Sequence, residues 1–435
     1  MRTFKKYCKI WGLESAVGQK HTEESITPLI QTLLLRFPRN GAGSLRTMLL
    51  QDYQVRVSKY VVLNVLRRID PEGVKSRKGK RYKRKVFYAA GVNHLWVFDQ
   101  HDKWAKYGLY FHMGIEPFSG KILWLVCWWT NSNPRYIAHQ YLETARRLGN
   151  ETHAILPLIT QSDPGSENNG IANAHTSIRH HLDPSLAGSL QHRWKRKHNN
   201  IKSEIAWSVF RSIWAPGFED LLELGVDQGW YDVTNSLHYF VFRWIAIPFI
   251  QHELDKYVHR NNTTAKRADK HKVLPHGIPD IIFERPHRFD AVDFHINVPH
   301  NILDQAQDQW APRDHPVFQL VHPHFDEFIR PIYESLNLPA TDVTNFWTIY
   351  LALIAAALAA EENQRVVQLL DAQMKVAEGG EDQGIPLLQG LSPVVMGENG
   401  IPMGFTLQND GHGYQEDDED LYVIFSDEED EDEAW

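Results

Sequence analysis

The chain has 435 residues, of which 43% are hydrophobic and 23% are charged. This balance is ordinary for a globular protein and excludes a wholly disordered or collagen-like chain. With only two cysteines, a disulfide framework and a cysteine-rich zinc module are excluded as well. All 46 Lys and Arg residues lie before position 410, whereas 13 of the 54 acidic residues lie from Asp410 onward. A slightly basic body, with a net charge of +5, therefore carries an acidic tail.

Hydropathy predicts no membrane association. The longest apolar run, Phe346 to Ala360, has 15 residues including Thr348. A membrane span needs about 20 apolar residues, so this run predicts a buried helix instead. The N-terminus lacks the apolar core of a secretory signal.

Three short helical patterns fill residues 25–70, namely SITPLIQTLLLRF, SLRTMLLQDY and VSKYVVLNVLRRID. Ser44 and Ser58 are the expected N-caps of the second and third. Three short helices with a tight turn before the last are typical of a helix-turn-helix, although a plain helical bundle has the same pattern. We predict a helix-turn-helix DNA-binding region over residues 1–72.

A basic run follows these helices, because eight of the eleven residues from Lys75 to Lys85 are Lys or Arg. Such a run is typical of a solvated linker, a nuclear address or a contact with phosphates. We predict a basic linker over 73–90 and a nuclear location. The linker residues expected to contact duplex DNA are Lys80, Arg81, Lys83, Arg84 and Lys85.

Residues 91–215 alternate between strand and helix patterns. Strands are expected at HLWVFD, LYFHMGIE, KILWLVCWW, THAILPLITQSD and residues 190–194, with helices at 134–148, 170–181 and 201–213. This order predicts an α/β domain with a mixed five-stranded sheet flanked by helices.

The remainder is expected to be a helical extension over 216–378 and an acidic, mostly disordered tail over 379–435. The longest helical pattern in the extension runs from Asp342 to Glu378. Within the tail, Leu421 to Phe425 (LYVIF) is a β-prone stretch between acidic runs. It resembles a SUMO-interacting motif, which adds a strand to a partner's sheet. A tail that only solubilises the protein is the simpler alternative.

Three acids stand out in the α/β domain. Asp99 and Asp163 end two predicted strands, and Glu204 lies in a predicted helix. Carboxylates at the ends of adjacent strands can converge, and such oxygen clusters suit divalent cations. Each acid also has a simpler explanation as a helix cap or a solvated surface group. Asp102 and Glu167 are rival candidates a few residues away.

Several motifs around these acids occur in a recognisable order. They are W-x-x-D at Trp96 to Asp99, the turn EPFSGKI at Glu116 to Ile122, D-x-G-S-E-N at Asp163 to Asn168, the helix acid Glu204, and RNNTTAKR and LPHGIP at Arg260 to Arg267 and Leu274 to Pro279. The sequence thereby resembles the retroviral-integrase-like core of the DDE transposase and integrase superfamily, and more narrowly the integrase core domain proteins of fungi and animals. One departure is Pro164, where many members have Asn.

This resemblance implies an RNase H-like fold over the core, 91–215, with Asp99, Asp163 and Glu204 as catalytic residues and as ligands of two Mg²⁺ or Mn²⁺ ions. A polyanionic substrate also fits the basic segment before Glu204. The additional residues expected to contact DNA are Arg193, Lys195, Arg196, Lys197, Lys202 and Arg211.

The function expected from these features is DNA integration or transposition by a polynucleotidyl transferase of mobile-element origin, acting on duplex DNA as a homo-oligomer. Two alternatives remain: a domesticated DNA-binding protein with an unused core, and an RNase H-like nuclease without strand transfer.

Overall fold

The computed structural model describes residues 6–8, 10–12, 14–77, 87–195, 200–266, 274–361, 365–370 and 384–395. Among them the chain forms two compact units. The first contains the N-terminal helices and residues 205–223, and the second contains the other described residues from position 87 onward. The basic run from Lys78 to Lys85, the basic loop residues 196–199 and the whole acidic tail from 396 lie outside the described residues.

The first unit is helical. Its N-terminal helices are α2 (Ala16–Gln19), α3 (Glu23–Arg36), α4 (Ala42–Tyr53), α5 (Lys59–Ile69) and α6 (Pro71–Ser76). Ser58 caps α5 as expected, because its hydroxyl accepts a hydrogen bond from the Val61 N–H at 3.3 Å. Ser44 is not the cap of α4, which begins one turn earlier after Gly41. The Ser44 hydroxyl instead donates to the Asn40 side chain at 2.6 Å.

Residues 205–223 complete this unit. They comprise most of α9 (Ile201–Ile213) and the first part of α10 (Ala215–Asp227). Phe218 packs edge-on against Phe37 at 6.0 Å and stacks on Trp214 at 4.4 Å. Asn40 donates to the Ile213 carbonyl oxygen at 2.6 Å. Aromatic burial therefore joins two segments that are far apart in the sequence.

The second unit is built on a five-stranded mixed sheet with the order β4-β3-β2-β6-β8. The strands are β2 (Leu95–His101), β3 (Tyr110–Glu116), β4 (Lys121–Trp128), β6 (Ile159–Ser162) and β8 (His192–Trp194). β2, β3 and β4 pair antiparallel, whereas β6 is parallel to both β2 and β8. This arrangement is the predicted RNase H-like α/β fold.

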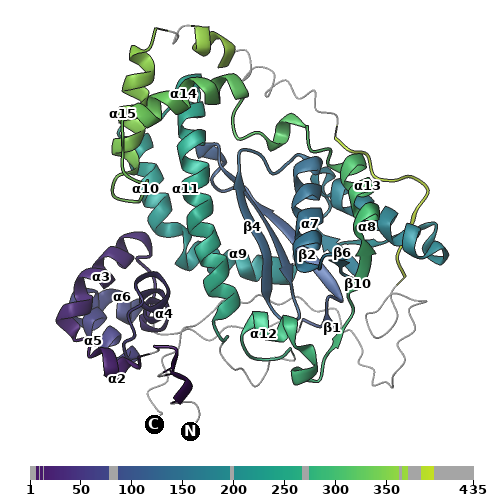
Figure 1. The fold of residues 1–435 in the computed structure, drawn as a ribbon, viewed down its shortest axis with the longest axis horizontal. Helices are drawn as coiled ribbons and strands as arrows, with labels where there is room; N and C mark the ends of the chain where they lie inside the picture. The colour runs from purple at the N-terminus through teal and green to yellow at the C-terminus, as the bar shows by residue number, and fades with distance from the viewer. Residues whose placement is uncertain are drawn as a thin grey trace. The chain divides into compact units, whose positions relative to one another are not determined.

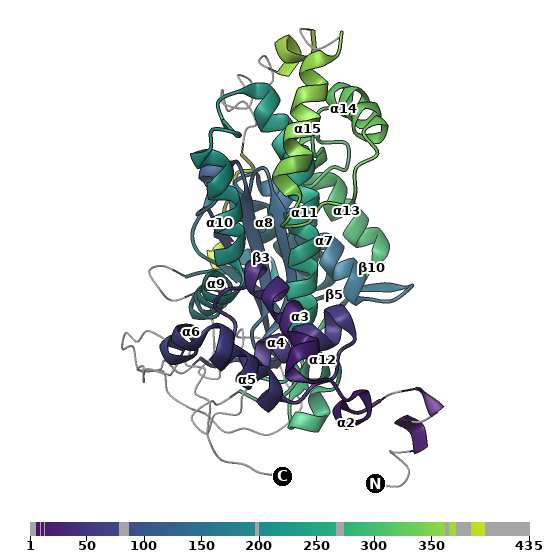
Figure 2. The same cartoon turned by 90° about the vertical axis from the view of Figure 1, so that its left-hand side faces the viewer.

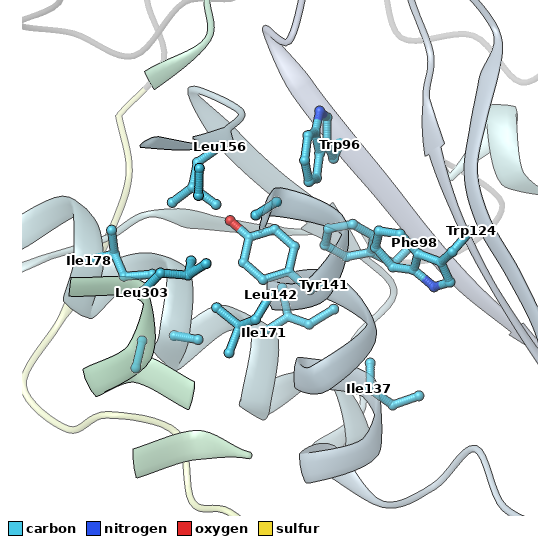
Figure 3. Close-up of a cluster of buried hydrophobic side chains, with 14 of the residues drawn as sticks. Trp96, Phe98, Trp124, Ile137, Tyr141, Leu142, Leu156, Ile171, Ile178 and Leu303 are labelled. Carbon is cyan, nitrogen blue, oxygen red and sulfur yellow. The ribbon is translucent and has the colours of Figure 1, made fainter. Parts of the chain in front are cut away.

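The main core lies between one face of the sheet and helices α7 (Pro134–Leu148) and α8 (Asn169–Leu182) (Figure 1). Side chains alternate along β2, so Trp96 and Phe98 point into this core. Figure 3 shows Phe98 beside Trp124 and Tyr141, with aliphatic side chains of α7 and α8 around them. The alternate residues Leu95 and Val97 enter a second cluster on the opposite face.

The expected single strand THAILPLITQSD is two strands. β5 (His153–Leu156) and β6 are separated at Pro157, which has no N–H for a sheet ladder. Only β6 joins the central sheet, while β5 pairs antiparallel with β10 (Ile296–Pro299) of the extension.

One margin of the sheet is covered by the C-terminal part of the chain. Along edge strand β4 lies α11 (Ser236–Thr263), which continues through Pro248 (Figure 1). Two of its side chains bond the strand's main chain: Gln251 bonds Cys127 N–H and the Leu125 carbonyl oxygen, and Asn262 bonds both groups of Ile122. In a separate two-stranded sheet, β11 (Ser392–Pro393) pairs with β7 (Ser189–Leu190). Covered edges cannot pair with another chain.

Further helices of the extension are α12 (Pro279–Glu284), α13 (His300–Trp310), α14 (Pro323–Ser335) and α15 (Phe346–Ala359). β1 (Gly91–Val92) pairs with β9 (Val292–Asp293). In both views α14 and α15 lie beside each other near one end of α11 (Figures 1 and 2). The expected helix over 342–378 is shorter than predicted, because α15 ends at Ala359. None of the described helices has the length and apolarity to cross a membrane.

Candidate active site

Two of the predicted acids lie at matching positions on neighbouring strands. In the parallel pairing of β2 with β6, Val97 lies opposite Gln161. Asp99 and Asp163 each lie two residues beyond this last pair, and Asp163 directly follows the end of β6. Neighbouring strands are about 4.8 Å apart, and residues two apart share a face. Both carboxylates therefore start from the sheet face opposite α7 and α8.

The third acid is brought there by the first turn of α9. Asn200, which precedes the helix and is buried, donates to the Phe98 carbonyl oxygen on β2 at 2.9 Å. Its side-chain oxygen accepts from Gln161 on β6 at 3.4 Å. The Ser203 hydroxyl lies within hydrogen-bonding reach of both the Asn200 carbonyl oxygen and the Asp99 carboxylate. Asn200 thus fixes the start of α9 on two strands and places Glu204 near Asp99.

Electrostatics show that the three acids interact. The pKa of Asp99 is raised to about 7, chiefly by burial and then by the negative charges of Asp163 and Glu204. Hydrogen bonds from the Gln100 N–H, at 2.9 Å, and from Ser203 oppose this shift. Like charges gathered around a buried carboxyl destabilise its ionised form. The structure therefore brings Asp99, Asp163 and Glu204 into one electrostatic cluster.

A divalent cation fits this donor set, because it would relieve the repulsion that raises the pKa of Asp99. Within the described residues, however, no three His, Cys, Asp or Glu side chains converge closely enough to hold one ion. The assignment of Asp99, Asp163 and Glu204 as shared metal ligands therefore stays a prediction.

The rival acids form a separate pair. Glu167 accepts a hydrogen bond from the Gln100 side chain, and its pKa is raised by burial and by the charge of Asp102. Asp102 accepts from Asn131 at 2.5 Å. Gln100 follows Asp99 on the same strand and so points to the opposite face. Alternation along β2 thus separates this pair from the three-acid cluster.

The loop after Asp163 is held by its own side chains. Asn168 donates to the Asp163 carbonyl oxygen at 3.3 Å and to the Glu167 carboxylate at 2.9 Å. A side chain at Gly165 would collide with that same carboxylate. Within D-x-G-S-E-N, the Asn therefore bonds the Asp carbonyl and the Glu carboxylate, and the Gly leaves room for that carboxylate. Pro164 is accommodated in this loop.

The residues predicted to contact DNA have different placements. Arg193 lies on β8 opposite Gln161, and the Lys195 N–H continues that pairing by donating to the Ser162 carbonyl oxygen at 2.9 Å. The Lys202 ammonium lies 5.0 Å from the centre of the Phe87 ring, and Arg211 is exposed on α9. The others fall outside the described residues: Lys80, Arg81, Lys83, Arg84, Lys85, Arg196 and Lys197.

The flanking motifs have structural roles. The buried Glu116 carboxylate accepts from the N–H groups of Phe118 and Ser119 and from the Ser119 hydroxyl, at 2.5–3.0 Å. These bonds close the turn between β3 and β4. Asn262 belongs to the downstream motif RNNTTAKR. Its side chain bonds the N–H and the carbonyl oxygen of Ile122, near the start of β4.

Sequence analysis did not single out Asn200, Gln161 or Ser203 as site residues. Their signal is weak, because polar residues beside a helix start usually act as caps. Asn200 and Ser203 do stand in the N-N-x-x-S-E run that ends at Glu204. Only the hydrogen bonds of Asn200 to β2 and β6, and of Ser203 beside Asp99, show their place next to the acids.

The strand order and directions of the sheet place this domain in the RNase H-like class. Residues 86–278 match the model of a family described as "Integrase core domain". This segment is thus a retroviral-integrase-like core, as the sequence motifs predicted. No curated protein matches the chain. The family indicates a function of the polynucleotidyl transferase type and, in general, DNA binding.

Proposed function

We propose that this protein is a DDE-type integrase or transposase that cleaves and joins DNA phosphodiesters at Asp99, Asp163 and Glu204. The observation that carries the proposal is that Asn200 and Ser203 hold the start of α9 beside Asp99 inside an integrase core. In support, the pKa of Asp99 is raised, first by burial and then by the charges of Asp163 and Glu204. Groups with strongly perturbed pKa values and a specific charged partner are often functional.

In this proposal the three carboxylates hold two Mg²⁺ or Mn²⁺ ions. When bound, such ions activate the attacking hydroxyl and stabilise the leaving oxygen of an in-line phosphoryl transfer. The chain's own contribution is orientation. Asn200 and Ser203 hold the start of α9 against β2, so that Glu204 and Asp99 face the same substrate phosphate.

The test is a pair of assays on the full chain with Mg²⁺ or Mn²⁺: nicking of supercoiled plasmid, and joining of donor DNA ends to a target. Wild type should do both, and Asp163→Asn should do neither. The matched control is Glu116→Gln, which changes a buried carboxylate of the core outside the three-acid cluster. DNA binding without nicking would favour the domesticated DNA-binding alternative, and nicking without joining would favour the nuclease.

We also propose that the N-terminal helices act as a helix-turn-helix on duplex DNA. On α5, Val62, Val65 and Leu66 are buried, whereas Lys59, Tyr60 and Arg67 are exposed along the outer face. This cationic and aromatic face suits a DNA groove. In the full chain, Lys59→Ala combined with Arg67→Ala should lower the salt dependence of binding by about two phosphate contacts. An unchanged salt dependence would contradict the assignment.

The remaining proposals concern the cellular setting: a mobile-element origin, a homo-oligomer on DNA, a nuclear location through the basic linker, and SUMO binding through Leu421 to Phe425. The last two rest on sequence outside the described residues. Inverted repeats flanking the gene would support the first. Microscopy of a fluorescent fusion, with the Lys80 to Lys85 cations replaced by Gln, would test the nuclear address.

A further inference from the structure

A buried polar chain of side chains lies directly behind Asp163. Thr160 and Ser162 are on β6, and His192 lies opposite Thr160 on β8. All three are almost fully buried on the sheet face that packs against α8. Apolar side chains usually fill such an interface, and buried polar groups cost free energy unless they are hydrogen-bonded.

The hydrogen bonds between these side chains connect to the main chain of Asp163. His192 Nδ1 lies 2.9 Å from the Thr160 hydroxyl, and His192 Nε2 lies 3.1 Å from the Ser162 hydroxyl. Ser162 in turn donates to the Asp163 carbonyl oxygen at 3.0 Å. Because a serine hydroxyl has one proton, this last bond requires His192 Nε2 to be the donor to Ser162. Thr160 then donates to Nδ1, and each proton in the series has an acceptor.

The same side chains could donate in the opposite order, but the distances support that order less well. Thr160 would then donate to the Gln191 carbonyl oxygen, which is 3.4 Å away, and the Asp163 carbonyl oxygen would lose its bond from Ser162. The relay toward Asp163 uses bonds of 2.9–3.1 Å throughout. A neutral imidazole, as the relay needs, agrees with the burial of His192, which lowers the pKa of its ring to about 3.

We infer that His192 is a positioning residue which, through the Ser162 hydroxyl, fixes the main chain at Asp163 and so the direction of its carboxylate. This inference rests on the proposed function for its catalytic meaning. Asp163 follows the last residue of β6, beyond the last residue paired with β2. The relay holds its carbonyl oxygen from within the core, while Asn168 holds the same oxygen from the loop side.

The experiment compares three variants of the full chain. His192→Gln can carry a donor nitrogen as far as the position of Nε2 and so keep the bond to Ser162. His192→Asn reaches only the position of Nδ1 and loses that bond. Ser162→Ala removes the link itself with little change in volume. Both histidine variants lose the ring, and His192→Asn also leaves the larger cavity. Ser162→Ala keeps the ring, so it separates loss of the hydrogen bond from loss of packing.

Two readouts are used, neither of which depends on turnover. The first is amide hydrogen exchange in the segment 163–168, measured without metal. We expect exchange about tenfold faster in His192→Asn and Ser162→Ala, and close to wild type in His192→Gln. The second is Mn²⁺ affinity by titration. We expect the first two variants to bind about tenfold more weakly, as mutation of groups that orient metal ligands typically does.

Equal exchange in His192→Asn and His192→Gln, or wild-type exchange in Ser162→Ala, would overturn the inference. Asp163→Asn serves as the reference for the proposed function. If Mn²⁺ affinity does not depend on Asp163, the proposed metal site fails, while the exchange data still decide whether His192 positions this loop.

Discussion

Two buried carboxyls of the same sheet have pKa values raised to about 7, yet their surroundings differ. Glu116 closes the β3–β4 turn and accepts three hydrogen bonds from that turn. Asp99 lies on the adjacent strand β2, where burial is the largest cause of the shift in its pKa and the charge of Asp163 is the next. At Glu116 burial is also the largest cause, and the charge of Asp293 contributes least. The two pKa values are therefore similar, and the two carboxyls differ in how much a neighbouring acid contributes to the shift.

The largest expected difference between the two carboxyls is in catalysis. Asp99→Asn should reduce metal-dependent nicking at least about a thousandfold, since it removes a charge on which phosphoryl transfer with bound cations depends. Glu116→Gln should stay within about threefold of wild type once folding is verified by circular dichroism. Rates on supercoiled plasmid measure both, and comparable losses in the two variants would refute the distinction.

The second difference is one of degree in pH dependence, because the pKa of Asp99 is raised from 3.8 to about 7 and that of Glu116 from 4.5 to about 7. An acid whose pKa is raised on folding adds stability below its unfolded pKa, and that contribution is lost as pH rises through the folded value. For Asp99, a rise from 3.8 to about 7 corresponds to about 4 kcal/mol between pH 4 and pH 8. Asp99→Asn should therefore become more stable than wild type as pH rises. Denaturant unfolding at pH 5, 6.5 and 8 measures this, and a gain independent of pH would contradict it.

A third difference is the sign of the effect on stability. Glu116→Gln should destabilise the protein by about 1–3 kcal/mol at pH 7, because the amide nitrogen cannot accept the N–H of Ser119. Asp99→Asn should stabilise it at the same pH, because the repulsion from two neighbouring acids disappears. Denaturant midpoints compare the two variants directly, and changes in stability of the same sign would contradict the predicted difference.

The smallest effect concerns added metal. Mn²⁺ at about ten times its dissociation constant should stabilise wild type by about 1.4 kcal/mol, since it binds only the folded site. The Glu116→Gln protein should gain as much, and Asp99→Asn little or nothing. Thermal melts with and without Mn²⁺, with Ca²⁺ as a second cation, provide the measurement. A gain in Asp99→Asn equal to that of wild type would place the bound ion elsewhere.

The amino-acid sequence was sufficient for the class of fold and for the acids themselves. Apolar, aromatic and β-branched runs predicted β2, β3 and β4, and ordered motifs pointed to the integrase core that residues 86–278 match. Such runs depend only on local composition, so they can be recognised without tertiary contacts. The predicted strand boundaries were wrong where a single residue sets them, as at Pro157, which separates β5 from β6.

The tertiary structure alone decided which polar residues form hydrogen bonds with one another. Asn200 reaches across about a hundred residues to β2, and His192 reaches Ser162 on β6. Such contacts depend on strand register and on helix docking, and they leave no periodic trace in the sequence. The same holds for the environments of Asp99 and Glu116, because burial and neighbouring charge are properties of packing. The sequence by itself determined which carboxylates the protein has, and the fold decided which of them repel one another.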